Sequence, residues 1–154
     1  METAEDLVNE QRICSDFVEP FFHCQALKLP EYGIDRCLIR DSLLNPGIKG
    51  FAEVKGTSYL LGQLDQRLQR REQYENLVWL KYATKCDCYI ITGWGDKKTY
   101  SVFTLTKVPR NPPIYSNDES GRTLRIPLSW FQSYTMHCDI AVPHHDYPTW
   151  LITS

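Results

Sequence analysis

Two charged residues interrupt an otherwise apolar strand pattern in the stretch FAEVKGT, residues 51–57. Side chains alternate between the two faces of a strand, so Glu53 and Lys55 point to one face and Val54 to the other. Burying a carboxylate or an ammonium costs several kcal/mol unless the group is paired or binds a ligand. This strand is therefore a candidate active site. The alternative is a solvated Glu–Lys ladder on an edge strand.

Length and composition indicate one globular domain, residues 1–154, in which 42% of the residues are hydrophobic and 23% are charged. The formal net charge is −2, so no global basic field indicates a nucleic-acid partner, and any contact with a polyanion has to be local. No apolar run is long enough to span a bilayer, and Met1–Glu2–Thr3 opens an acidic helix rather than a basic leader. We therefore expect a cytoplasmic protein without a membrane partner.

Hydrophobic spacing predicts a helix followed by a three-strand meander in the first part of the chain. Glu10 falls on the apolar line of the helix, and Asp35 starts the second strand. The meander places Asp35 and Glu53 on adjacent antiparallel strands, so that their side chains could meet on one face. We expect the helix at 3–21, the strands at 22–29, 34–39 and 51–57, and the turns at 30–33 and 43–49.

A second, longer helix is expected after the meander. Thr57 or Ser58 can cap it, and leucines at three- and four-residue steps continue the pattern to about Ala83. The run CYIIT, residues 88–92, is typical of a strand covered on both faces. Beyond it we expect strands at 100–106 and 123–126, a loop at 107–121, a short helix at 128–134 and an irregular tail at 137–154.

The order helix, three-strand meander, helix, strand resembles that of the PD-(D/E)XK nuclease superfamily, which includes Holliday-junction resolvases and many restriction nucleases. The resemblance covers about residues 3–93. It rests on Gly33–Ile34–Asp35 leading into an apolar strand and on Ala52–Glu53–Val54–Lys55–Gly56 leading into a capped helix. One departure is Ile34, which stands in place of the eponymous proline. The resemblance implies an α/β fold with a restriction-endonuclease-like core, extended by extra strands over about 94–154.

The resemblance also implies a site for the hydrolysis of phosphodiester bonds. Asp35 and Glu53, with the carbonyl group of Val54, would hold Mg²⁺ or Mn²⁺, and hard oxygen ligands suit such an ion. A bound ion lowers the pKa of a coordinated water and stabilises developing negative charge. Lys55 would orient the attacking water or help to stabilise the transition state.

Two further residues extend this candidate site. Glu10 would supply the extra catalytic and metal-binding carboxylate that many members draw from the first helix. Gln63, with Gln66 as the runner-up, resembles the glutamine that many members place beside the catalytic lysine. Each has a plainer interpretation: Glu10 as an ordinary carboxylate on a helix flank, Gln63 as one of several glutamines on its helix, and Asp35 as the end of a turn.

Local clusters of cations are candidates for binding DNA. Arg67, Arg70 and Arg71 form the densest basic cluster, and on a helix beside the site they could contact phosphates, which supply most non-specific affinity. The same arginines could instead be a solvated face paired with neighbouring acids. Lys97 and Lys98, on a predicted turn, are a second candidate for phosphate contacts.

Six cysteines scattered through expected helices and strands predict reduced, buried thiols rather than a disulfide framework. A competing interpretation joins some of them to histidines in a zinc site, because structural zinc takes paired ligands two to four residues apart. A Cys–His hydrolase also fits the composition, but no local signature supports it. The cysteines are Cys14, Cys24, Cys37, Cys86, Cys88 and Cys138, and the candidate zinc ligands are Cys86, Cys88, His137, Cys138, His144 and His145.

These features together favour a metal-dependent endonuclease that acts on DNA. The alternative from another class is a non-catalytic domain of the same fold that binds nucleic acid or protein. The sequence leaves open the form of the DNA substrate and the oligomeric state, with a homodimer as one option.

The interpretation of the cysteines can be tested directly. Titration of freshly purified protein with a thiol reagent, under denaturing and non-reducing conditions, should count all six cysteines as free thiols. A count of four or fewer would contradict the reducing compartment that we infer.

Overall fold

The structure, a computed structural model, describes residues 3–29, 35–40, 44, 47–105, 115–116 and 122–144. Its helical segments are α1 (Ala4–Ile13), a π-helical turn (Cys14–Val18), α2 (Glu19–Phe22), α3 (Arg71–Thr84) and a 3-10 turn (Leu128–Trp130). Its strands are β1 (Cys24–Lys28), β2 (Arg36–Arg40), β3 (Ile48–Gly56), β4 (Gln66–Arg70), β5 (Asp87–Gly93), β6 (Thr99–Thr104), β7 (Tyr115–Ser116), β8 (Thr123–Pro127), β9 (Gln132–His137) and β10 (Ile140–Pro143).

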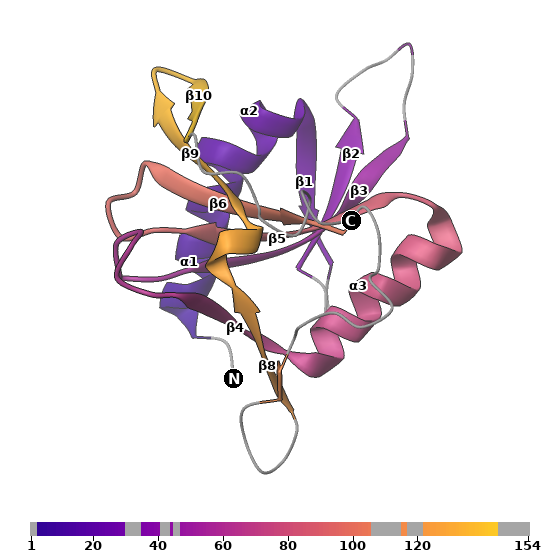
Figure 1. The fold of residues 1–154 in the computed structure, drawn as a ribbon. Helices are drawn as coiled ribbons and strands as arrows, with labels where there is room; N and C mark the ends of the chain where they lie inside the picture. Colours follow the sequence, from indigo (N-terminus) through magenta and orange to yellow (C-terminus); the bar gives the residue numbers. More distant parts are fainter. Residues whose placement is uncertain are drawn as a thin grey trace.

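Seven of these strands form one mixed sheet in the order β1-β2-β3-β5-β6-β9-β10, shown in Figure 1. β1, β2 and β3 form the antiparallel meander that the sequence predicts, and β5 runs parallel to β3. Parallel neighbours need a crossover connection, and the segment containing β4 and α3 supplies it. Strands β6, β9 and β10 extend the sheet in antiparallel pairs. The α/β class predicted from the sequence is confirmed.

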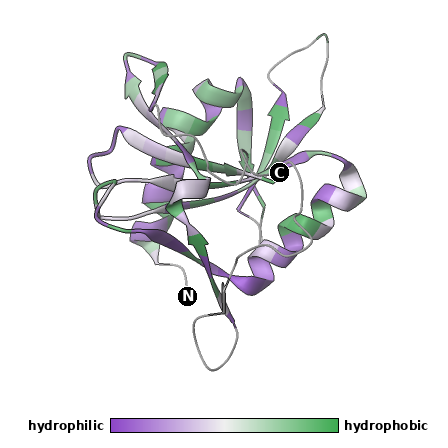
Figure 2. Cartoon of the chain, in the orientation of Figure 1, coloured by the Kyte–Doolittle hydropathy of each residue, from purple (hydrophilic) through white to green (hydrophobic). Residues whose placement is uncertain are grey.

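Each face of the large sheet carries its own hydrophobic core. On the first, which we call the α1 face, Phe17 and Val18 of the π-helical turn pack with Ala52 and Val54 of β3. The second, the α3 face, is covered by α3 and by the small sheet β4-β8-β7. Figure 2 shows apolar and polar residues alternating along α3, as expected for a helix that buries one stripe. Because strand residues alternate, Glu53 lies on the α3 face.

The N-terminal helical segment agrees with its prediction. Thr3 caps α1: its side chain accepts a hydrogen bond from the backbone N–H of Asp6, whose carboxylate accepts one from the N–H of Thr3. The helical path continues through the π-helical turn and α2, and ends at His23, whose φ of 52° is left-handed. The expected helix at 3–21 therefore corresponds to residues 4–22.

The predicted helix from residue 57 to 83 is wrong in its first half. Gly62 has a φ of +99°, and the N–H of Gln63 donates to the carbonyl of Leu60 at 3.0 Å, so this segment makes a tight turn. Residues 66–70 then form strand β4, paired antiparallel with β8. In β4 the buried residues are Arg67 and Gln69, while Leu68 is exposed. Because the residues that face inward are polar, β4 lacks the alternation of hydrophobic and polar residues that predicts a strand. The spacing of the leucines favoured a helix instead.

The C-terminal part also differs from its prediction. The short helix expected at 128–134 is one 3-10 turn followed by β9, and the tail begins with a hairpin between β9 and β10. In the expected loop at 107–121, Tyr115–Ser116 form β7, and the other residues lie outside the described ranges. The same holds for the predicted turn at 30–33, for Ile34 and for residues 145–154. Among the helices described, none is long and apolar enough to cross a membrane.

The close approach of β3 to β5 generates a prediction about stability. A Cβ on Gly50 would lie 2.3 Å from the backbone oxygen of Asp87, whereas one on Gly56 would lie 3.4 Å from its nearest neighbours, in side chains of Asn9 and Ile13. Gly50→Ala should therefore lower the free energy of unfolding by about 1–3 kcal/mol, as overpacking does. Gly56→Ala is the control on the same strand and should cost far less. Denaturant titration measures both, and equal losses would contradict the packing described here.

Candidate functional site

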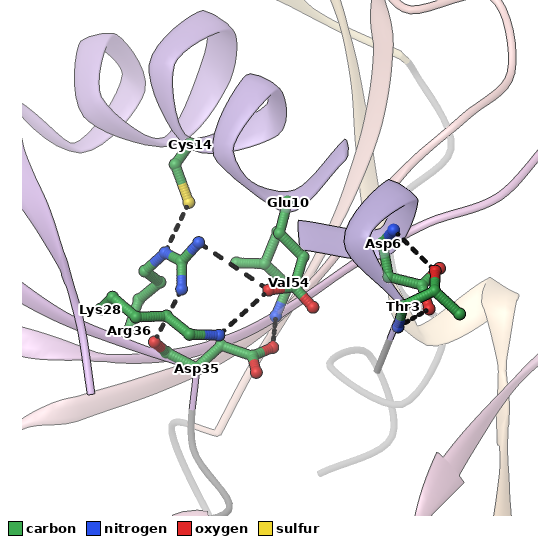
Figure 3. A network of polar contacts seen from close by, with 8 residues as sticks. All are labelled: Thr3, Asp6, Glu10, Cys14, Lys28, Asp35, Arg36 and Val54. Atoms are coloured by element: carbon green, nitrogen blue, oxygen red, sulfur yellow. Dashed lines mark hydrogen bonds and ion pairs between the residues drawn. The ribbon is translucent and has the colours of Figure 1, made fainter. Parts of the chain in front are cut away.

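Asp35 and Glu53 lie opposite each other on the α3 face. The register pairs Arg36 with Ala52, and one step further places Asp35 across from Glu53. The carboxylate of Asp35 accepts a hydrogen bond from the backbone N–H of Val54 at 2.8 Å, drawn in Figure 3. The sequence expectation that these two acids share one face agrees with this geometry.

Burial and the neighbouring acid change the chemistry of Glu53. The side chain is 2% exposed, and burial together with the negative charge of Asp35 raises the pKa of Glu53 to about 9, although Arg67 acts in the opposite direction. Glu53 is therefore protonated at neutral pH. Its Oε1 atom has no hydrogen-bond partner within the described part of the chain. A solvated ladder on an edge strand is ruled out, because β3 lies between β2 and β5.

Lys55 follows on the same face, where β3 extends past the start of β2. It is exposed, unlike Glu53. Partial burial and the positive charge of Arg67 lower the pKa of Lys55, while Asp6 of α1 acts in the opposite direction. Among the ion pairs of the described residues there is none between Glu53 and Lys55. A structural Glu53–Lys55 pair therefore does not account for the burial of Glu53.

Arg67 is buried, whereas the sequence predicts an arginine on a helix that contacts DNA. It lies on β4 rather than on a helix, is 6% exposed, and points toward the large sheet. Its Nη1 atom donates to the carbonyl of Ile91 at 2.6 Å and to the hydroxyl of Thr92 at 2.9 Å. Burial lowers the pKa of Arg67 to about 10, with Glu53 and Asp35 opposing the shift, so it is charged at neutral pH. A side chain held in this way is not available to DNA phosphates.

Glu10 lies in a cluster of charges on the α1 face, and its negative charge also acts on Arg67. It is 8% exposed, and its Oε2 atom is 3.4 Å from Nζ of Lys28 and 3.8 Å from Nη2 of Arg36. Figure 3 shows Arg36 at the centre of this cluster, where it also donates to the thiol of Cys14 and to the carbonyl of Asp35. Sequence reasoning missed Lys28 and Arg36. The signal for Arg36 was a charge on the apolar strand directly after Asp35.

The two glutamine candidates are not on a helix. Gln63 is exposed, and its Oε1 atom accepts a hydrogen bond from the backbone N–H of Leu60 at 2.7 Å, within its own turn. Gln66 is half-buried at the start of β4. The expectation that Gln63 occupies the first turn of a helix beside Lys55 is therefore wrong, because the predicted helix does not begin there.

The candidate DNA-binding cations fall into exposed and buried sets. Arg70 and Arg71 are exposed at the start of α3, and Arg71 forms an ion pair with Glu75 at 2.8 Å, as the solvated-face alternative expects. Lys97 and Lys98 are exposed on the turn between β5 and β6. Burial of Arg67 removes one of the three arginines from the predicted cluster.

The cysteine and histidine pairs of the zinc interpretation lie at opposite ends of β6. Cys88 is buried beside the end of β6, and its carbonyl accepts a hydrogen bond from the N–H of Leu105. His137 and Cys138 lie at the other end, after the part of β9 that pairs with the start of β6. Cys138 is exposed, contrary to the expectation of buried thiols, and all six cysteines are free. His145 lies outside the described residues. Across those residues, no three His, Cys, Asp or Glu side chains are grouped to hold a metal.

Comparison with known proteins does not identify a family for this chain. No protein-family model, curated protein or solved structure gives a significant match to the chain.

The raised pKa of Glu53 generates a prediction about pH. Its folded-state value of about 9 lies above the ordinary 4.5, so the folded protein keeps a proton that the unfolded chain loses. Stability from this group is complete below pH 4.5 and is lost as the pH rises toward 9. Glu53→Gln does not titrate, so its melting temperature relative to wild type should rise between about pH 5 and pH 9.

Thermal unfolding followed by circular dichroism checks this across the pH range. Glu75→Gln removes an exposed carboxylate on α3 and serves as the control, with no comparable trend expected. The same dependence of melting temperature on pH in wild type and Glu53→Gln would contradict a protonated Glu53.

Proposed function

We propose that this protein is a metal-dependent phosphodiesterase that cleaves DNA, with a site formed by Asp35, Glu53 and Lys55. The observation that supports this best is the pair of carboxyl groups on one face, with Oε1 of Glu53 buried and without a partner in the described structure. Folds rarely bury two neighbouring carboxyl groups without a ligand, because burial penalises the ionised form of each and the charge of one raises the pKa of the other. A ligand that attracts both groups explains the arrangement.

The donor chemistry fits a divalent cation such as Mg²⁺ or Mn²⁺. Asp35 and Glu53 supply hard oxygen atoms, and the carbonyl of Val54 leaves β3 on the same side as its N–H, which contacts Asp35. Glu10 is already engaged by Lys28 and Arg36 on the α1 face, so we do not include it among the ligands. Mg²⁺ sites in proteins commonly use one or two carboxylates and complete the shell with waters and substrate phosphates.

Each residue of the proposed site would have its own role. A bound ion supplies charge neutralisation and an acidified water. Asp35 and Glu53 hold the ion, and Glu53 must give up its proton for this. Lys55, exposed at the end of the site, contacts a phosphate oxygen or the attacking water. The exposed cations Arg70, Arg71, Lys97 and Lys98 are our candidates for contacts with DNA phosphates outside the site.

A second candidate function is a non-catalytic binding domain of the same fold. The specific observation in its favour is the burial of Glu53, at 2% exposure, beneath a strand that brings its own cation, Arg67. In that case Arg67 would be the permanent counter-ion of the carboxyl pair. The two functions differ in whether the pair responds to divalent ions.

The test is DNA cleavage with Mg²⁺ or Mn²⁺, against an EDTA control, on supercoiled, linear and branched DNA. Glu53→Gln and Lys55→Ala should each reduce the cleavage rate by about 10²–10³, the usual loss when one preorganised electrostatic contact is removed. Both variants should retain DNA affinity, because it would come from cations outside the site.

Two control variants make the result specific. Glu75→Gln, a charge change on the exposed side of α3, should leave cleavage unchanged. Lys98→Ala should weaken DNA binding and make the affinity less dependent on salt. It should not change the cleavage rate at saturating DNA. Full cleavage by Glu53→Gln, or no ion-dependent cleavage by the wild type on any of the three substrates, would reject the catalytic proposal in favour of the binding domain.

A further inference from the structure

The face that carries Glu53 has a fixed positive charge. Arg67 reaches it from β4 and is anchored to β5 by the carbonyl of Ile91 at 2.6 Å and the hydroxyl of Thr92 at 2.9 Å. In the parallel register Thr92 lies beside Lys55. The guanidinium is therefore held one strand away from the proposed site and cannot leave it without losing both bonds.

Several buried polar atoms on this face have no hydrogen-bond partner among the described residues: Oε1 of Glu53, Nε of Arg67 and Oε1 of Gln69, which points inward from β4 like Arg67. The side chains of Glu53 and Arg67 are only 2% and 6% exposed. Buried polar groups in folded proteins are nearly always hydrogen-bonded. An unpartnered acceptor and an unpartnered donor on one face mark a position prepared for a ligand.

The charges around this position can be counted. On the α1 face, Glu10 pairs with both Lys28 and Arg36, and these three charges sum to +1. On the α3 face, the buried and half-buried groups are Asp35, Glu53 and Arg67, and their charges sum to −1 once Glu53 has given up its proton. Lys55 lies on the same face but is exposed, so solvent screens its charge and it is left out of this sum. One divalent ion changes this sum to +1, and a phosphodiester then brings it to zero. A second divalent ion would bring the sum to +3 before the phosphodiester binds, or to +2 with it bound, in a buried place and at a prohibitive cost.

We propose that Arg67 is a resident cation of the Asp35–Glu53 pair, which limits the pair to one divalent ion and keeps that ion weakly bound until a phosphate arrives. This inference rests on the proposed function, because it needs a site that binds metal. It gives Arg67 a positioning and charge-balancing role instead of the DNA contact that the sequence predicted. It also makes ion and phosphate bind cooperatively, since each lowers the electrostatic cost of the other.

The test is an equilibrium titration of the full chain with Mn²⁺, in which electron paramagnetic resonance counts the free ion. Wild type should bind one ion. Arg67→Met removes the charge but keeps an extended side chain, and should tighten Mn²⁺ binding by about tenfold or more. Arg67→Lys keeps the charge and should stay within about threefold of wild type. Arg70→Met, on the same strand but exposed, is the matched control and should not change the affinity.

The outcomes separate this inference from the proposed function. Two ions bound to wild type, or an Arg67→Met affinity equal to or weaker than wild type, overturns the role of Arg67 while metal binding stands. No Mn²⁺ bound to wild type, or binding unaffected by Glu53→Gln, overturns the proposed function and this inference with it. If Arg67→Met does not fold, the ion count of wild type and the affinity of Arg67→Lys still decide, and a Lys variant that binds markedly tighter rejects the charge argument.

Discussion

The buried guanidinium of Arg67 is the interaction on which the α3 side of this molecule depends. It joins two layers, because Arg67 belongs to the small sheet and its two hydrogen-bond acceptors belong to β5 of the large sheet. A buried arginine without acceptors or negative charge nearby would be strongly destabilising. At neutral pH Asp35 provides that negative charge, because Glu53 is protonated, and Arg67 in turn lowers the cost of placing the two acids together.

The arrangement of charges in this site does not maximise the stability of the fold. Glu53 is protonated at neutral pH because burial and Asp35 together outweigh Arg67. Replacing such a carboxyl group by a neutral isostere commonly stabilises a fold, which is a recurrent property of functional sites. Lys55 and the half-buried Asp35 are the more accessible members of the site, and under the proposed function a phosphate would approach along them.

The two sides of the sheet carry different charge clusters, although a few residues separate them in the sequence. Arg36 lies opposite Ala52 and contacts Glu10, while Asp35, one residue earlier, lies opposite Glu53. Alternation along β2 therefore sends neighbouring charges to opposite faces. Glu10, which falls on the apolar line of α1, is paired on this side with Arg36 and Lys28.

The sequence by itself determined the first helical segment, the meander and the facing of Asp35 and Glu53, because these follow from local periodicity and from the strict alternation of strand side chains. It could not determine β4. There the buried residues are Arg67 and Gln69, so the inward face was polar and the leucine spacing favoured a helix. Only the tertiary structure shows that Arg67 is buried against β5 and not exposed to solvent. Its acceptors are 24 and 25 residues away in the chain, and no local pattern encodes a contact that long-range packing creates.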